Sequence, residues 1–174
     1  MKLKLSNNEK KYLQGALSFN EAEKYIKKFN NKIFVIKYGG SALDNRYLAN
    51  NFAKDLVLIK KLGINIVILH GGGVQISETL KKRKINSKFI NGLRVTDKKI
   101  VDTVEEVLID FNNDIVNSLK KLGSEAASFH TKNSNIIEVE PEREELGFVG
   151  IPKKINANLI EDELNKNKIP IIAP

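Results

Sequence analysis

The sequence predicts an α/β fold, a three-layer αβα sandwich around a mainly parallel central sheet. Two short apolar runs without alternation, residues 33–37 and 64–69, are typical of strands buried on both faces of a parallel sheet. Apolar residues at helical spacing follow each run, at Phe52–Leu62 and at 74–84. The order strand, helix, strand, helix indicates right-handed crossover units. With 174 residues, 41% of them hydrophobic, the chain is long enough for one compact domain.

The remaining elements follow from similar patterns. A helix is predicted over 19–29, with Ser18 and Glu21 at the spacing of a capping box. A long helix is predicted from an N-cap at Thr96 to Gly123. Weaker patterns predict strands over 125–129 and 135–140, a turn and strand edge at 147–150, a helix over 157–167 and a buried strand over 168–174. Because chain ends are usually surface appendages, an end directly after a core strand predicts a truncated chain.

Composition favours a cytoplasmic protein without a nucleic-acid partner. The net charge is +8, but the lysines are scattered and no basic run alternates with aromatic residues. This pattern indicates a solvated lysine-rich surface, and the alternative is a polyanion partner. A modest positive field would still attract a nucleotide or a small dicarboxylate. There is no cysteine, no apolar stretch of membrane-spanning length and no secretory signal, so we expect neither thiolate metal ligands nor a membrane location.

Two glycine loops are candidates for binding anions. Lys37-Tyr-Gly-Gly-Ser41 follows the first predicted strand, and His70-Gly-Gly-Gly73 follows the second and opens a helix. Ligands bind at the carboxyl ends of such strands, and glycine lets backbone N–H groups approach an anion closely. The helix N-terminus adds further donors. Together the loops predict a cradle for phosphate or carboxylate, and the alternative is two tight strand-to-helix turns. Neither loop fits the Walker or the dinucleotide-binding pattern.

Three side chains in or near these loops carry charged or titratable groups: Lys37, His70 and Arg94. Lys37 would direct its ammonium group at the cradle, unless it simply extends from the strand end into solvent. Arg94 lies in a loop leading to a helix and offers a fork that matches a carboxylate, the alternative being a salt bridge with Asp97. We expect His70 to hydrogen-bond locally rather than to ligate a metal, and we predict no metal site.

These motifs resemble the amino acid kinase family and, within it, the acetylglutamate kinases. The resemblance runs from Ile33 to Pro174. His70-Gly-Gly-Gly-Val-Gln-Ile76 is similar to a loop of the wider family, and Phe89-Ile-Asn-Gly-Leu-Arg-Val-Thr-Asp97 to the more specific signature of the acetylglutamate kinases. The chain departs from the family at Ser128–Ser134, which stands where a glycine-rich segment is usual, and at Asp110, which replaces a glycine.

The resemblance implies a function and residue roles. The reaction would transfer phosphate from ATP, with Mg²⁺, to the side-chain carboxylate of N-acetyl-L-glutamate, giving N-acetylglutamyl phosphate in arginine biosynthesis. No permanently bound cofactor is expected. Lys37 would be catalytic, and Arg94 would bind the substrate's other carboxylate. The implied substrate-binding glycines are Gly71, Gly72 and Gly73. The implied phosphate-binding glycines are Gly39, Gly40, Gly71 and Gly72.

The resemblance also implies a domain organisation. Residues 1–30 would be an N-terminal helical extension, and residues 31–174 the substrate-binding N-terminal lobe, without the C-terminal ATP-binding lobe. The 174-residue chain alone is then expected to be inactive. A homo-oligomer is expected, a dimer or a hexamer assembled through the N-terminal helix. Two alternatives remain: another amino acid kinase, with carbamate, aspartate, glutamate or a nucleotide as acceptor, or a non-catalytic binding or regulatory half.

Overall fold

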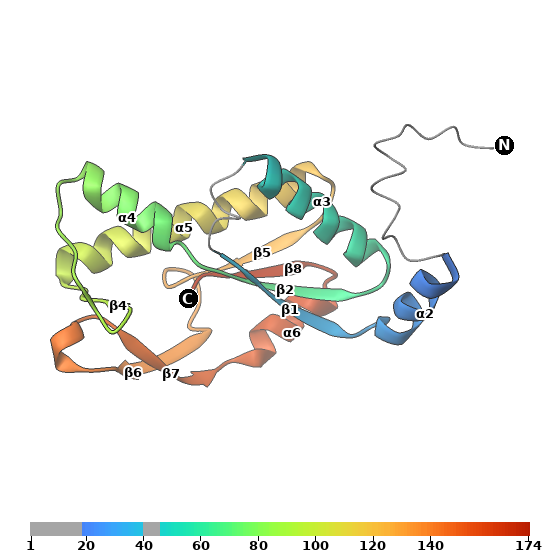
Figure 1. The fold of residues 1–174 in the computed structure, drawn as a ribbon. Coiled ribbons are helices and arrows are strands. Elements are labelled where there is room, and N and C mark those ends of the chain that lie inside the picture. Colours follow the sequence, from blue (N-terminus) through green and yellow to red (C-terminus); the bar gives the residue numbers. More distant parts are fainter. Residues whose placement is uncertain (1–18, 40–45) are drawn as a thin grey trace.

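A four-stranded parallel sheet forms the centre of the computed structural model, which describes residues 19–39 and 46–174 (Figure 1). The order across the sheet is β1-β2-β8-β5. The strands are β1 (Ile33–Tyr38), β2 (Asn65–His70), β8 (Ile169–Ile172) and β5 (Ala126–Phe129). The two central strands, β2 and β8, carry isoleucines that are completely buried. This burial on both faces explains their continuous apolar runs.

Helices cover both faces of this sheet, which confirms the predicted three layers (Figure 1). On one face lie α3 (Arg46–Lys61) and α5 (Lys98–Lys121), with α4 (Gly73–Lys82) packed beside α5. On the other face lies α6 (Ala157–Asn165). The predicted N-terminal helix is α2 (Phe19–Phe29), and its predicted capping residue, Ser18, lies outside the described residues. No helix in the described part of the chain is both long and apolar enough to span a bilayer.

Two antiparallel hairpins extend from this frame. The first joins β3 (Phe89–Ile90) to β4 (Leu93–Arg94). The second joins β6 (Ile137–Pro141) to β7 (Gly150–Ile155), with the 3-10 turn η2 (Glu144–Leu146) between them. The strand predicted over 135–140 therefore belongs to a separate hairpin, and not to the central sheet. Figure 1 shows this second hairpin on the α6 side of the sheet.

The expectation that the first strand is buried on both faces is wrong. Within the described residues β1 lies at an edge of the sheet, and Val35 is 70% exposed. The opposite face of β1 is covered, because Tyr38 packs against α3 and α5. The α6 helix instead packs over β2 and β8, where Val67 and Ile172 are buried. The apolar run of β1 thus reflects one buried face only.

The start of α5 also differs from the prediction, because Asp97 and not Thr96 is the N-cap. The Asp97 carboxylate accepts a hydrogen bond of 2.9 Å from the Ile100 N–H. Thr96 is buried, and its backbone forms a parallel bridge to Gly147. Its N–H donates to Leu146 O at 2.9 Å, and its carbonyl accepts from the Phe148 N–H at 2.8 Å. This bridge ties the segment before α5 to the loop between β6 and β7.

Candidate functional site

The glycine loop after β2 lies where the sheet ends and α4 begins. The Gly71 N–H donates to Tyr38 O at 2.9 Å, so this loop is joined directly to the end of β1. Gly72 is the N-cap of α4 and has no side-chain cap, and the first intrahelical bond runs from the Ile76 N–H to Gly72 O at 2.8 Å. The N–H groups of a first helical turn lack intrahelical acceptors and mark the positive end of the helix dipole. This terminus can therefore accept an anion.

The three glycines of this loop have different physical roles. A Cβ at Gly72 would lie 2.8 Å from Leu108 Cδ2, so any larger residue there would force the Leu108 side chain to move. A Cβ at Gly71 or Gly73 would meet no atom of the described residues within 4 Å. Because the Gly71 N–H is already used by Tyr38, the donors left for a ligand begin at Gly72. The open space at Gly71 and Gly73 gives a ligand room to approach.

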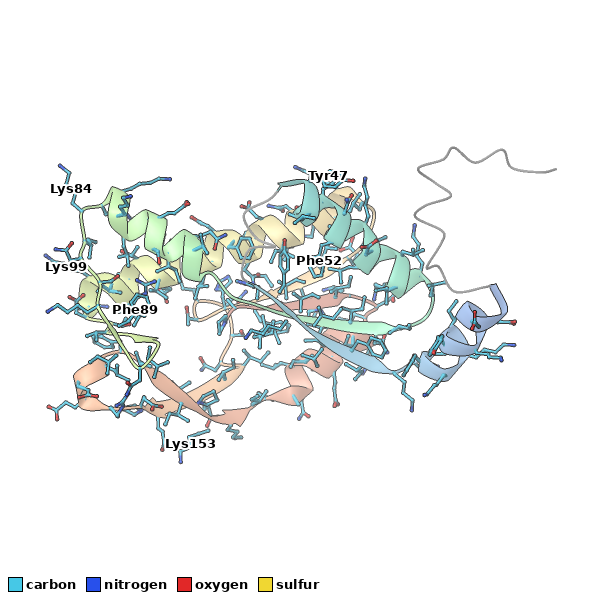
Figure 2. The ribbon with its side chains drawn as sticks, viewed as in Figure 1. Tyr47, Phe52, Lys84, Phe89, Lys99 and Lys153 are labelled. Carbon is cyan, nitrogen blue, oxygen red and sulfur yellow. The ribbon has the colours of Figure 1, made fainter. Side chains whose placement is uncertain are left out.

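A hairpin turn positions Arg94. Asn91 and Gly92 both have positive φ, 49° and 83°, as a two-residue type I′ turn requires. The turn pairs Arg94 with Phe89 across the hairpin, and the guanidinium carbon lies 4.6 Å from the centre of the Phe89 ring. Figure 2 labels Phe89 on this hairpin, at the same end of α5 as Lys99. The expected loop around Arg94 is thus a hairpin, and the Asn91-Gly92 dipeptide is its signal in the sequence.

The guanidinium of Arg94 reaches the first turns of α4. Its Nη2 donates to Ser77 Oγ at 2.8 Å, and the Ser77 hydroxyl donates to Gly73 O at 2.8 Å. Its Nη1 donates to Ser87 Oγ at 2.6 Å. The salt bridge with Asp97 that the sequence left open does not form, since Asp97 caps α5. Among the described residues no carboxylate lies within 4.0 Å of the guanidinium. The structure thus places Arg94 beside the first turns of α4, and its hydrogen-bond partners within 19–39 and 46–174 are neutral.

Lys37 lies at the same end of the sheet as the loop. It pairs in register with Leu69, next to the pair of Tyr38 with His70. Tyr38 and His70 face α5, where both rings contact Phe111. Because strand side chains alternate, Lys37 is on the opposite face, and it is exposed. A Cβ at Gly39 would meet nothing within 4 Å, whereas Gly40 lies outside the described residues.

His70 is buried beneath the loop, and the prediction of a local hydrogen bond is confirmed. Its Nδ1 lies 3.0 Å from Gly71 O, and its Nε2 lies 3.1 Å from Asn112 Nδ2. Burial lowers the pKa of His70, more than its bond to the Gly71 carbonyl raises it. The sequence analysis missed Asn112, which is completely buried in the middle of α5. The available signal was a polar residue at an inward position between Leu108 and Ile115.

The segment that departs from the family pattern forms a turn closed by its own side chains. After β5, Asn133 Oδ1 accepts from the His130 N–H at 2.9 Å, and Asn133 Nδ2 donates to Ser128 O at 2.8 Å. Thr131 Oγ1 donates to Glu105 on α5 at 2.6 Å. This turn borders a cavity of about 710 Å³ between α5, the β6–β7 hairpin and the end of β8. Neither Arg94 nor Gly71–Gly73 lines that cavity, so it is separate from the loop.

Comparisons with known proteins agree with this arrangement. The sequence pattern of the amino acid kinase family matches residues 32–174. An acetylglutamate kinase from Pelagibacter ubique is 46% identical over 154 residues, which are 88% of this chain and 54% of that relative's length. The chain spans about half the length of the curated relatives it matches.

Solved structures share the fold. A Streptococcus mutans protein superposes with a TM-score of 0.74 at 30% identity, over 81% of this chain and 58% of that one. An N-acetylglutamate synthase from Neisseria gonorrhoeae, solved with coenzyme A and N-acetyl-glutamate, gives a TM-score of 0.76 at 21% identity, over 90% of this chain and 36% of that one, a likeness of fold alone. With the motifs, the parallel sheet and the family pattern in agreement, the chain belongs to the amino acid kinase family.

Proposed function

We propose that this chain provides the substrate-binding half of a kinase that phosphorylates the side-chain carboxylate of N-acetyl-L-glutamate. One observation carries the proposal: the Arg94 guanidinium, whose partners among the described residues are all neutral, lies beside the N-terminal turns of α4. The Pelagibacter ubique relative named acetylglutamate kinase supports the choice of substrate. A molecule with two carboxylates suits a site that combines an arginine fork with a row of backbone donors.

In this proposal each end of the substrate has its own partner. Arg94 binds the α-carboxylate through its fork, displacing the weaker bonds to Ser77 and Ser87. The N–H groups that begin at Gly72, together with the space left by Gly71 and Gly73, hold the reacting side-chain carboxylate. Gly39 follows Tyr38, whose carbonyl accepts from the Gly71 N–H. In this proposal Gly39, Gly40, Gly71 and Gly72 receive the transferring phosphoryl group.

The chemistry needs positioning more than proton transfer. A glutamate-type carboxyl group has a pKa of about 4.3, so it is already an anionic nucleophile at neutral pH. Its oxygen forms a bond to the γ-phosphorus of ATP while the bond to the β,γ-bridging oxygen breaks, giving an acyl phosphate and ADP. Negative charge develops on the oxygens during transfer, and in this proposal Lys37 stabilises it.

ATP enters the proposal with Mg²⁺ as part of the nucleotide substrate. Within the described ranges there is no group of three or more His, Asp or Glu side chains suited to a metal ion. Because the chain spans only about half the length of the relatives it matches, we treat ligand binding and catalytic turnover as separate expectations. N-acetyl-L-glutamate binding is expected of this chain, and phosphoryl transfer is expected when the remaining length found in relatives is supplied.

A ligand panel in titration calorimetry tests the proposal. The 174-residue chain is titrated with N-acetyl-L-glutamate and, separately, with L-glutamate, L-aspartate, carbamate and uridine monophosphate. The expected result is saturable binding of N-acetyl-L-glutamate, at least about tenfold tighter than any other ligand. Tighter binding of another compound would favour a different acceptor. A fusion of this chain to the part of a relative that it does not match gives a further test. If the chain binds N-acetyl-L-glutamate selectively but the fusion does not phosphorylate it, the regulatory-half hypothesis is favoured.

We also propose that the chain forms a homo-oligomer through α2 and acts in the cytoplasm. Support for the contact comes from Tyr25, which is 50% exposed and stacks on Phe29 with ring centres 6.4 Å apart. Sedimentation velocity is expected to show a dimer or a larger species for the parent chain and a smaller species for Tyr25→Glu. A parent chain that sediments as a monomer would refute this part.

A further inference from the structure

Asn112 places a polar side chain in the protein interior, where most side chains are apolar. It lies in the middle of α5, with no exposed surface, against the ends of β2, β8 and β5. A buried amide is stable only when its donors and acceptor are satisfied. Asn112 meets this requirement with four partners from three strands, and one of these partners is the ring of His70.

The partners of Asn112 fix which way its amide points. Its Nδ2 lies 3.0 Å from Ile171 O and 3.4 Å from Phe129 O, and carbonyl oxygens can only accept. Its Oδ1 lies 2.6 Å from Ser128 Oγ, which donates. The amide nitrogen must therefore be the atom that faces His70 Nε2, and it faces it as a donor.

This orientation determines the protonation of His70. Asn112 Nδ2 has two hydrogens, and its two shortest contacts are Ile171 O at 3.0 Å and His70 Nε2 at 3.1 Å. With the second hydrogen directed at Nε2, this ring nitrogen accepts and carries no proton. Nδ1 lies 3.0 Å from the Gly71 carbonyl, so it must carry one. His70 is then the neutral Nδ1–H tautomer. An imidazolium would turn an N–H toward another N–H, and burial also lowers the pKa of His70.

The tautomer in turn orients the glycine loop. The Nδ1–H bond holds the Gly71 carbonyl toward the ring. Because the C=O and N–H of a trans peptide point in opposite directions, the Gly72 N–H is turned away from the ring. The Gly71 N–H is held by Tyr38 O, so both peptide groups of Gly71 are anchored. The Gly72 N–H is the first donor that this loop presents outward.

We infer that Asn112 is a positioning residue of the glycine loop: by fixing His70 as the Nδ1–H tautomer it aims the Gly72 N–H and the start of α4 at the ligand. The ligand part of this inference rests on the proposed function, and the tautomer part does not.

Ring-nitrogen NMR of the ¹⁵N-histidine-labelled chain tests the tautomer directly. The chain has two histidines, and the second is an internal reference. His130 Nδ1 accepts from the Lys132 N–H at 3.2 Å, so His130 is expected to carry its proton on Nε2. At about pH 8, above the ordinary histidine pKa of about 6.5, the spectrum should contain one Nδ1–H and one Nε2–H ring. A His130→Gln variant assigns the signals.

Two substitutions then test the role of Asn112. In Asn112→Asp the carboxylate can only accept, so His70 should change to the Nε2–H tautomer or to imidazolium, and the Gly72 amide signal should shift. The affinity for N-acetyl-L-glutamate should fall about tenfold. Ser128→Ala is the matched control, because it removes the bond to Oδ1 but leaves Ile171 O to orient the amide. It should keep both the tautomer and the affinity.

The outcomes separate this inference from the proposed function. A parent chain in which His70 is Nε2–H or charged at about pH 8 would overturn the inference, even if Asn112→Asp fails to fold. Retention of the Nδ1–H tautomer in a folded Asn112→Asp would also overturn it. If the tautomer changes as expected while the parent chain does not bind N-acetyl-L-glutamate, the proposed function fails and the positioning role stands.

Discussion

The two ends of α4 each meet an arginine, and the two arginines have different partners. At the C-terminal end, Arg83 Nη2 donates to Glu106 Oε1 at 2.7 Å and its Nη1 to Thr103 Oγ1 at 3.3 Å, which joins α4 to α5. Nearer the N-terminal end, Arg94 donates to two serine hydroxyls and stacks on Phe89. Arg83 is thus paired with a carboxylate, whereas the partners of Arg94 in the described part of the chain are neutral.

The electrostatics of the two arginines follow from these partners. The hydrogen bond and the attraction of Glu106 raise the pKa of Arg83, and Arg83 lowers the pKa of Glu106. Partial burial lowers the pKa of Arg94. A cation with its own carboxylate ties elements together, whereas a cation with only hydroxyl partners can still gain by binding an anion. This difference is why we propose the N-terminal end of α4, and not its C-terminal end, as the binding site.

The largest expected effect is on ligand binding. Arg94→Ala should weaken N-acetyl-L-glutamate binding by about 1.5–3 kcal/mol, because a charged hydrogen-bonded pair is lost. Arg83→Ala is the matched control from the other end of α4 and should leave the affinity unchanged. Titration calorimetry of the parent and both variants gives the comparison. Equal losses in the two variants would remove the distinction between the two ends.

The next largest effect is on stability, and it should differ between Gly72 and Gly73 at the N-terminal end of α4. Gly72→Ala should lower the free energy of unfolding by about 1 kcal/mol, because the new methyl group forces the Leu108 side chain to move. Gly73→Ala meets no neighbour and should leave stability equal or slightly higher, since alanine favours the helix. Urea denaturation measures both. A similar loss in Gly73→Ala would contradict this account of the loop.

Acidification should have a smaller effect on the free energy of unfolding, through His70, which is buried below the N-terminal end of α4. Burial lowers the pKa of His70 in the folded chain from its usual 6.5. As the pH falls below 6.5, the unfolded chain takes up a proton that the folded chain does not, so the free energy of unfolding should decrease. Urea denaturation at a series of pH values down to about 5 should show this decline. In His70→Gln the decline should be weaker, and an unchanged slope would argue against His70 as its source.

The smallest effect is expected at the C-terminal end of α4. Arg83 and Glu106 are both exposed, so solvent and salt screen their attraction. Glu106→Gln should shift the thermal midpoint only slightly at low ionic strength and not at all in about 1 M salt, where the screening length is about 3 Å. A large, salt-independent loss of stability would show that this ion pair is a main anchor of α4 to α5.

The sequence was most informative where a local pattern decides the structure. The apolar run of β2, the glycines after it and the apolar face of α4 lie in one continuous stretch, and each boundary falls within one or two residues of the prediction. The resemblance to the family also carried over to the fold, because the parallel order of the strands follows from the crossover helices.

The sequence was least informative where distant segments meet. Thr96 and Asp97 are both good N-caps, and the choice falls to Asp97 because Leu146 and Phe148, far along the chain, occupy the backbone of Thr96. The partners of Arg94 also come from another element, with Ser77 on α4. Asn112 interrupts the apolar face of α5, and nothing in the neighbouring sequence indicates that His70 and Ser128 will contact it.

The parallel bridge between Thr96 and Gly147 has a mechanical consequence. Gly147 has a φ of +67°, and a side chain there would overlap the Thr96 carbonyl, so glycine makes this contact possible. The bridge thereby connects the segment that carries Arg94 to the loop between β6 and β7. Because the same bridge holds the Thr96 and Phe148 N–H groups, their amides should show similar protection against exchange with deuterium.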